Sequence, residues 1–231
     1  MKTRMAALLL ALALCAGCST SQAQINRHNA GVYVAGVLDE TYAGAASDAY
    51  YTLTGRTAED AQKTFEANLD AEYAQRLALR FELEDEFVPR ALKADFLELL
   101  DTVYRKAGYE VKEATPLDDG RYCVELTVTP VTFFAAAYQD GYKALREDFE
   151  KTHSLPDEDD EDLTGAQARK AKERFESQWA QAVYDYLYGR LDAVTTGSAV
   201  TKLVLVSPDS QGLYALSDTD RRDVDDLILQ Y

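Results

Sequence analysis

The sequence predicts an α+β fold in which helices pack mainly on one face of an antiparallel four-stranded sheet. Two observations predict it. Apolar residues recur at helical spacing through most of the 231-residue chain, but the pattern changes to strict alternation in two places. Each of those places holds two short segments joined by a turn-forming stretch, which is typical of a β-hairpin. Two hairpins that are separated by helices describe one antiparallel sheet with helical cover. We therefore expect four strands in two hairpins, and six helices.

Three helices are expected before the first hairpin. The first spans residues 29–46, and its apolar residues recur at three- and four-residue intervals. The second begins at Thr57, whose side chain and that of Asp60 have the spacing of a capping box. The third spans residues 88–107 and carries Pro89, which suits a first helical turn because it has no N–H to leave unpaired.

The first hairpin is expected to pair residues 109–115 with residues 121–129. Between them lies Pro-Leu-Asp-Asp-Gly at 116–120, which is rich in turn-forming residues. In the second strand, apolar side chains alternate with smaller or polar ones, and the apolar set is Tyr122, Val124, Leu126 and Val128. Successive side chains of a strand point to opposite faces, so one face of this strand should be buried.

The second half of the chain is expected to begin with two helices, at residues 132–150 and 164–191. A hairpin that pairs residues 199–206 with 213–216 should follow, and a helix at 217–231 should close the chain. An acidic loop at 153–163 should join the two helices, because a run of like charges is usually solvated. A calcium loop is the alternative for this segment. Ala171 stands where such a loop needs a bidentate glutamate, which favours the solvated loop.

The N-terminus has the three parts of a secretory signal peptide. Lys2 and Arg4 supply a positive head, residues 5–14 form an unbroken apolar run, and small residues follow at 16–17. The run is too short to span a bilayer, which needs about 20 apolar residues. The segment therefore directs export and does not predict a transmembrane helix.

The end of this segment, Leu-Cys-Ala-Gly-Cys at residues 14–18, resembles a bacterial lipobox. The resemblance implies cleavage after residue 17 and attachment of a diacylglycerol to Cys18. Two acyl chains give stable membrane anchoring, whereas one gives only marginal binding. The alternative is an ordinary signal peptide cut after Ala23, which would leave a soluble secreted protein.

The chain as a whole resembles uncharacterised bacterial lipoproteins with a cystatin-like or NTF2-like domain. The resemblance rests on the lipobox and on Gly-Arg-Tyr-Cys-Val-Glu-Leu-Thr-Val at residues 120–128. It implies a curved sheet that wraps on helices. With the short polar stretch after the lipobox, the sequence predicts a signal peptide at 1–17, a tether at 18–28 and a single α+β domain at 29–231. This class has no shared catalytic residues to carry over.

The net charge of −16 excludes several partners. Nucleic acid binding needs a basic surface, and so does direct binding to anionic lipid headgroups. Membrane attachment should therefore come from the lipid at Cys18. Once Cys18 is acylated and the signal removed, Cys123 is the only thiol left, and the chain has two histidines. We expect no disulfide, no metal site and no cofactor.

The sequence indicates binding in preference to catalysis. It contains no nucleophile elbow and no glycine-rich phosphate loop. His28 lies in the tether and His153 beside the acidic segment, and a working base must be held in a cleft. We expect a non-catalytic module that binds an envelope protein or a small ligand. The alternatives are a small carboxylate-dependent envelope hydrolase and a structural subunit of an envelope complex.

An aromatic-rich side of the two middle helices is the candidate binding surface. Its members are Tyr138, Tyr142, Trp179, Tyr184 and Tyr188. Residues four apart share a helical face, so the two pairs of tyrosines should form short aromatic ridges. Exposed aromatic side chains are typical of interfaces. The alternative is that these side chains line a wide buried face, because tyrosine tolerates half-burial.

Overall fold

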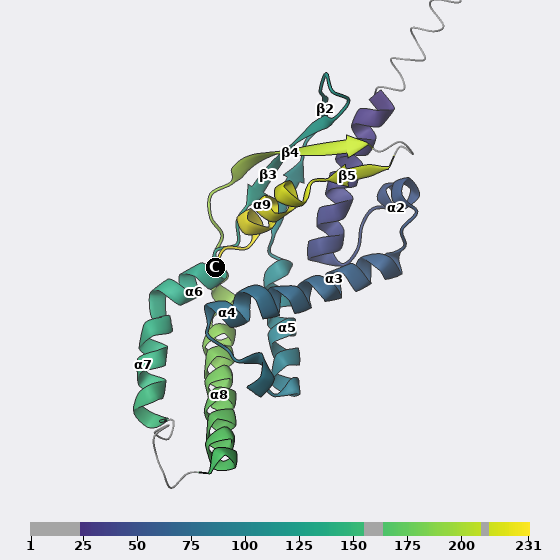
Figure 1. Ribbon diagram of the computed structural model, residues 1–231. Coiled ribbons are helices and arrows are strands. Elements are labelled where there is room, and N and C mark those ends of the chain that lie inside the picture. The colour runs from purple at the N-terminus through teal and green to yellow at the C-terminus, as the bar shows by residue number, and fades with distance from the viewer. Residues whose placement is uncertain (1–23, 155–163, 209–212) are drawn as a thin grey trace, which may run out of the picture.

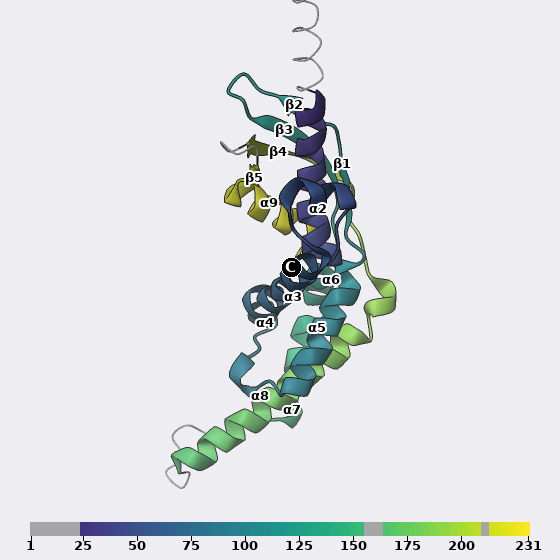
Figure 2. The same cartoon turned by 90° about the vertical axis from the view of Figure 1, so that its right-hand side faces the viewer.

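The computed structural model describes residues 24–154, 164–208 and 213–231, which form an α+β fold (Figure 1). An antiparallel sheet and the helices that cover it occupy one end of the molecule. A group of helices extends away from the sheet at the other end (Figures 1 and 2). In the described ranges, no helix is long and apolar enough to cross a membrane.

Three predictions concern residues outside these described ranges. The signal peptide at 1–17, the lipidation site Cys18 and the acidic run at 157–162 lie outside the described residues. The predicted tether is partly described, and residues 24–28 are helical.

An N-terminal helix over residues 24–43 begins the described chain and is followed by α2 (Asp48–Thr54). Ser47 caps α2 by accepting from the backbone N–H of Tyr50, and Gly55 ends it with a φ of 71°. This helix was not expected from the sequence, so the prediction of six helices was wrong. Seven residues are too few to show helical periodicity, so only these capping residues signal it.

The second expected helix is one long helix with a π-helical turn inside it. It consists of α3 (Ala58–Glu72), the π turn η1 (Tyr73–Leu77) and α4 (Ala78–Arg80). The predicted capping box of Thr57 and Asp60 is confirmed. After a 3-10 turn, η2 (Asp85–Phe87), the third expected helix follows as α5 (Arg90–Tyr104).

The sheet contains β1 (Gly108–Val111), β2 (Thr115–Pro116), β3 (Tyr122–Thr129), β4 (Val200–Pro208) and β5 (Tyr214–Leu216). Its order is β1-β3-β4-β5, with β2 pairing to β3, and every pair is antiparallel. The prediction of four strands was wrong in one detail, because the strand expected at 109–115 is divided into β1 and β2. The fully buried Ala114 lies at this break.

The predicted alternation in β3 is confirmed. Its buried face carries Val124, Leu126 and Val128, all with 0% exposure, and Val204 and Val206 continue that face on β4. The N-terminal helix and α9 (Asp218–Ile228) cover this face. Side-chain contacts tie both helices to it: Tyr109 donates to Asp39 over 2.8 Å, and Lys202 donates to Asp223 over 2.5 Å.

The remaining helices are α6 (Phe133–Ala137), the π turn η3 (Tyr138–Tyr142), α7 (Lys143–Thr152) and α8 (Gly165–Tyr188), with a 3-10 turn, η4 (Leu191–Ala193), after them. A Thr164–Gln167 capping box begins α8. The expectation that the helices pack mainly on one sheet face was wrong for α7 and α8. The two helices pack on each other, where Phe149 of α7 contacts Phe175 and Trp179 of α8. In addition, α8 packs on α5.

Candidate functional site

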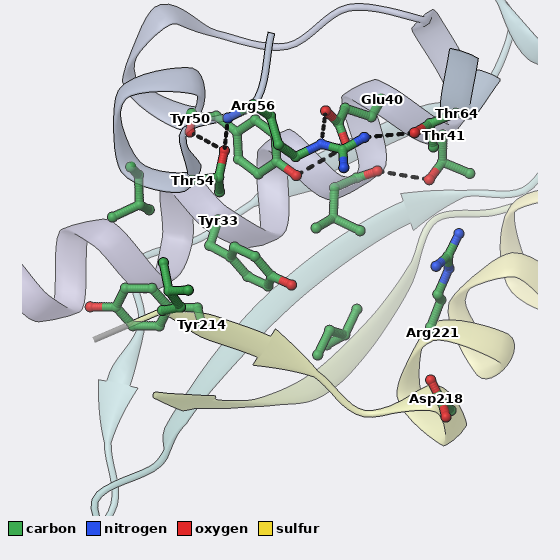
Figure 3. Close-up of a pocket in the computed structure, with 14 residues that line it drawn as sticks. Tyr33, Glu40, Thr41, Tyr50, Thr54, Arg56, Thr64, Tyr214, Asp218 and Arg221 are labelled. Carbon is green, nitrogen blue, oxygen red and sulfur yellow. Dashed lines mark hydrogen bonds and ion pairs between the residues drawn. The ribbon is translucent and has the colours of Figure 1, made fainter. Parts of the chain in front are cut away.

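A cleft of about 350 Å³ opens where the N-terminal helix, α2, β5 and α9 meet (Figure 3). The N-terminal helix contributes Tyr33, Val37, Glu40 and Thr41, whose intervals of three and four residues place them on one face. The rest of the lining comes from segments up to 188 positions away in sequence. The cleft is therefore a product of tertiary packing.

A glycine sets how closely α2 approaches the N-terminal helix. A Cβ atom built on Gly36 would lie 2.0 Å from Cδ2 of Tyr50, much closer than two atoms can approach. The missing side chain lets the Tyr50 ring lie directly on the helix, where it is 2% exposed. This packing brings the Tyr50 hydroxyl to Glu40, one turn further along the same helix.

Glu40, Arg56 and Tyr50 form one wall of the cleft. The Glu40 carboxylate is 4% exposed, and it accepts from Nε of Arg56 over 2.7 Å and from the Tyr50 hydroxyl over 3.1 Å. Both its oxygens are therefore occupied, as a buried charge requires. The hydrogen bond to Glu40 raises the pKa of Arg56, and burial together with the Glu40 charge raises the pKa of Tyr50.

Arg56 is fixed from a second side as well. Its Nη2 donates to the hydroxyl of Thr64 over 2.7 Å and to the backbone carbonyl of Asp60 over 3.3 Å. An arginine held by a carboxylate, a hydroxyl and a carbonyl has little freedom to follow a ligand. This side of the cleft is preorganised.

Arg221 lies on the opposite side of the cleft, at the start of α9 (Figure 3). No carboxylate of the described chain lies within 4.0 Å of its guanidinium nitrogens. Between the two arginines lies Tyr33, whose ring centroid is 6.2 Å from that of Tyr50 and 6.0 Å from that of Tyr214. Burial raises the pKa of Tyr33, and the charge of Arg221 acts against this rise.

The cleft offers positive charge, hydroxyl groups and apolar surface. Apolar contact comes from Val37, Leu53 and Leu216 and from the tyrosine rings. The residues that line it include no histidine, cysteine or serine. Its two carboxylates are Glu40, which Arg56 already engages, and Asp218, which lies at the start of α9. The arrangement suits capture of a small molecule with an anionic group and an apolar body.

The cleft was not predicted from the sequence. A polar and aromatic stripe over Tyr33, Glu40 and Thr41 was visible within the first expected helix. Nothing in the sequence connects that stripe to Arg221, about 180 residues later. The predicted binding surface lies elsewhere in the molecule.

Two members of the predicted aromatic surface are core residues. Trp179 is 0% exposed and donates from Nε1 to the carbonyl of Phe81 over 3.1 Å. Tyr142 is 6% exposed and stacks on Tyr138 at 4.6 Å between centroids, within the π turn. The guanidinium of Arg80 lies 3.7 Å above the centre of the Tyr138 ring and covers its other side.

Tyr138 is half-buried, and the last two members lie at the C-terminal end of α8. Tyr184 and Tyr188 stack with centroids 5.6 Å apart, and Tyr188 is 60% exposed. They line a groove with the C-terminal half of α5. The structure thus separates Tyr138, Tyr142 and Trp179 from the pair at the end of α8, in which Tyr184 is half-buried and Tyr188 is exposed. It confirms the stacking of the residues that are four apart.

A pair of carboxylates with raised pKa lines a smaller cavity of about 210 Å³. Burial raises the pKa of Glu72, although Arg76 lies 3.5 Å away, and burial also raises the pKa of Asp225. Asp225 accepts from the hydroxyl of Tyr42 over 2.5 Å. Tyr231 faces Glu72. Side chains of the N-terminal helix, α3 and α9 thus meet around this cavity.

The histidines and the cysteine lie apart from both cavities. His28 is on the N-terminal helix, and His153 stacks on Phe149 at 4.2 Å between centroids. Cys123 lies on β3, on the face opposite the buried valines, and is partly exposed. Among the described residues no group of three or more histidine, cysteine and acidic side chains is placed to hold a metal ion.

Comparison with known proteins supports the fold. No family model matches the chain, and no curated protein sequence matches it. A solved structure does match. It is the crystal structure of a "putative lipoprotein" (ycdA) from Bacillus subtilis, with a TM-score of 0.54 and 11% sequence identity.

The match covers 88% of this chain and 56% of the Bacillus subtilis chain, so this chain spans little more than half the length of that protein. At this identity the likeness shows a shared fold. The cystatin-like or NTF2-like form of the domain stays a prediction.

Proposed function

We propose that this protein is a lipid-anchored, extracytoplasmic binding protein of the bacterial envelope, which takes up a small organic anion in the cleft without transforming it. The observation that carries the proposal is the position of Arg221. Its guanidinium faces the cleft with no ion-pair partner in the described residues, while Arg56 across the cleft is already held by Glu40.

The chemistry of the ligand follows from the cleft. A guanidinium binds carboxylate or phosphate oxygens through two parallel hydrogen bonds, which a partly desolvated site strengthens. The rings of Tyr33 and Tyr214 provide flat apolar contact beside it. A volume of about 350 Å³ is at the small end for ligand sites. These features together favour a compact anion with an apolar or aromatic body.

The anchor is supported by two independent facts. The residues at 14–18 resemble a lipobox, which implies acylation of Cys18. The Bacillus subtilis protein with the similar fold is described as a "putative lipoprotein", which is consistent with such an anchor. A net charge of −16 would repel an anionic membrane surface, so attachment through acyl chains fits the composition.

The test uses benzoate, which combines one carboxylate with one ring, and its neutral analogue benzamide. Benzoate should shift the NMR signals of Tyr33 and Tyr214 with a dissociation constant in the millimolar range, and benzamide should bind more weakly. Arg221→Gln should weaken benzoate binding about tenfold, because a charge-assisted hydrogen bond is lost. Arg222→Gln is the matched control, since Arg222 lines the Glu72–Asp225 cavity instead. Equal binding by wild type and Arg221→Gln, or no shift up to about 20 mM benzoate, would contradict the proposal.

The carboxylate pair favours a second candidate, a small hydrolase. Glu72 and Asp225 both line the smaller cavity, and burial raises the pKa of each, as a general acid requires. Hydrolysis of nitrophenyl glycosides tests this candidate. Activity that both Glu72→Gln and Asp225→Asn abolish would support it, and activity in neither the wild type nor the variants would leave the binding function.

A further inference from the structure

A groove of about 830 Å³ lies between the C-terminal half of α5, the end of α8 and the η4 turn. It shares no lining residue with the cleft described above. Its lining includes Glu98, Thr102, Tyr184, Tyr188 and Asp192. The rings of Tyr184 and Tyr188 and several carboxylates line this groove.

The aromatic side of the groove is a supported platform. Phe96 is fully buried, and its ring meets the Tyr184 ring edge to face at 5.4 Å between centroids. Tyr188 stacks on Tyr184 in turn, and its side chain remains 60% exposed. Tyr188 is the only aromatic residue among the most exposed large apolar side chains of the described chain. An aromatic ring held flat by a second ring offers a fixed face to a ligand.

The charges around this platform are mainly negative. Neither Glu98 nor Asp192 has an ion-pair partner within 4.0 Å in the part of the chain that the structure describes. A third carboxylate in the lining, Asp101, is held by Arg105 at 3.0 Å. Lys106 is the positive side chain in the lining, and it is exposed. Burial raises the pKa of Tyr184, and the charges of Asp95 and Glu98 add to this rise.

We propose that this groove binds an arginine side chain presented by a peptide segment of a partner protein. A guanidinium stacks on a tyrosine face, since the ring's negative π face attracts a cation. Its remaining N–H donors are then directed at carboxylate oxygens in the plane of the group. Arginine fits better than lysine here, because its planar group can stack and donate at the same time.

The test measures binding of three capped tripeptides to the full chain by NMR. They carry arginine, lysine or glutamine between two glycines. The arginine peptide should shift the ring signals of Tyr184 and Tyr188, bind more tightly than the lysine peptide, and weaken as salt is raised. The glutamine peptide should leave these signals unchanged. Equal binding of all three peptides, or of arginine and lysine, would overturn the assignment.

Variants test the two parts of the site separately. Tyr188→Ala should weaken arginine-peptide binding about two- to fivefold, whereas Tyr188→Phe should retain it, since the ring persists. Asp192→Asn should also weaken binding, and Lys106→Gln should strengthen it. Asp70→Asn is the matched charge control, because it removes one exposed carboxylate from α3 that does not line the groove. Unchanged binding in both Tyr188→Ala and Asp192→Asn would overturn the proposal.

The groove and the proposed anion site are separate parts of the molecule. Arg221→Gln should leave arginine-peptide binding unchanged, and Tyr188→Ala should leave benzoate binding unchanged. The two proposals can therefore fail independently.

Discussion

The hydroxyl of Tyr42, on the N-terminal helix, donates to Oδ1 of Asp225, on α9, over 2.5 Å, across 183 positions of sequence. Tyr42 is 3% exposed, and its ring lies 5.2 Å from that of Tyr104 on α5. The two helices that cover the sheet are thus joined by a largely buried polar contact. A carboxylate removed from water must keep its donors, so this contact should be important for stability.

We predict that Tyr42→Phe lowers the free energy of unfolding by about 1–3 kcal/mol, because it leaves the Asp225 carboxylate without its donor. Urea denaturation followed by circular dichroism measures the change. Tyr138→Phe is the control, since no hydrogen bond of the Tyr138 hydroxyl is found among the described residues. Its effect should stay within about 0.5 kcal/mol. Equal effects of the two substitutions would show that the contact does not stabilise the fold.

The two carboxylates of the smaller cavity, Glu72 and Asp225, predict how stability depends on pH. Burial raises the pKa of Glu72 and of Asp225 in the folded protein above their unfolded values. The folded state therefore binds these protons more tightly than the unfolded state. The stabilisation is complete below the unfolded pKa, near 4, and is lost as the pH rises through the higher folded pKa.

The free energy of unfolding should accordingly increase when the pH is lowered from 7 towards 5. Glu72→Gln should flatten this dependence, because the side chain no longer titrates. Asp70→Asn removes an exposed carboxylate and should leave the slope as in wild type. Denaturation curves at several pH values compare the three proteins. A slope in Glu72→Gln as steep as that of wild type would contradict the assignment.

A third prediction concerns the glycine that shapes the cleft. Replacing glycine by alanine in a helix interior usually stabilises by about 1 kcal/mol. Gly31→Ala should follow this rule, because its Cβ would meet only the Lys112 carbonyl at 3.6 Å. Gly36→Ala should instead lower the melting temperature, since its Cβ would overlap the Tyr50 ring. It should also weaken benzoate binding by displacing α2. A melting temperature for Gly36→Ala that equals or exceeds that of Gly31→Ala would be inconsistent with this packing.

The predicted aromatic surface shows what sequence periodicity can and cannot establish. The spacing of Tyr184 and Tyr188 correctly predicted that they stack, because residues four apart share a helical face. Periodicity does not say which face meets a neighbouring element. Trp179 donates a hydrogen bond to the backbone carbonyl of Phe81, which lies 98 positions away, and the sequence does not reveal that contact. The alternation of β3 was readable because a strand with one buried face repeats every two residues.

The burial of Trp179 and the exposure of Tyr188 predict losses of stability of very different size when each side chain is truncated. Trp179→Ala should destabilise the protein by about 3–5 kcal/mol, since it empties a fully buried site and leaves the Phe81 carbonyl without its donor. Tyr188→Ala removes a side chain that is 60% exposed and should change stability by less than about 1 kcal/mol. Thermal denaturation of both variants provides the measurement. Similar losses would mean that Tyr188 also supports the core.

The last prediction concerns the anchor. The described N-terminal helix starts at residue 24, six positions after Cys18, so a lipid on Cys18 would hold the sheet end of the molecule near the membrane (Figure 1). Cys18→Ser should move the protein from the membrane fraction to the soluble fraction, because the two acyl chains that hold it are no longer attached. Cys123→Ser is the control and should remain membrane-bound, since its thiol lies on β3 within the domain. Mass spectrometry of the wild type should find a diacylglyceryl group on an N-terminal Cys18. A wild-type chain that begins at Gln24, or a Cys18→Ser variant that stays in the membrane fraction, would contradict lipid anchoring.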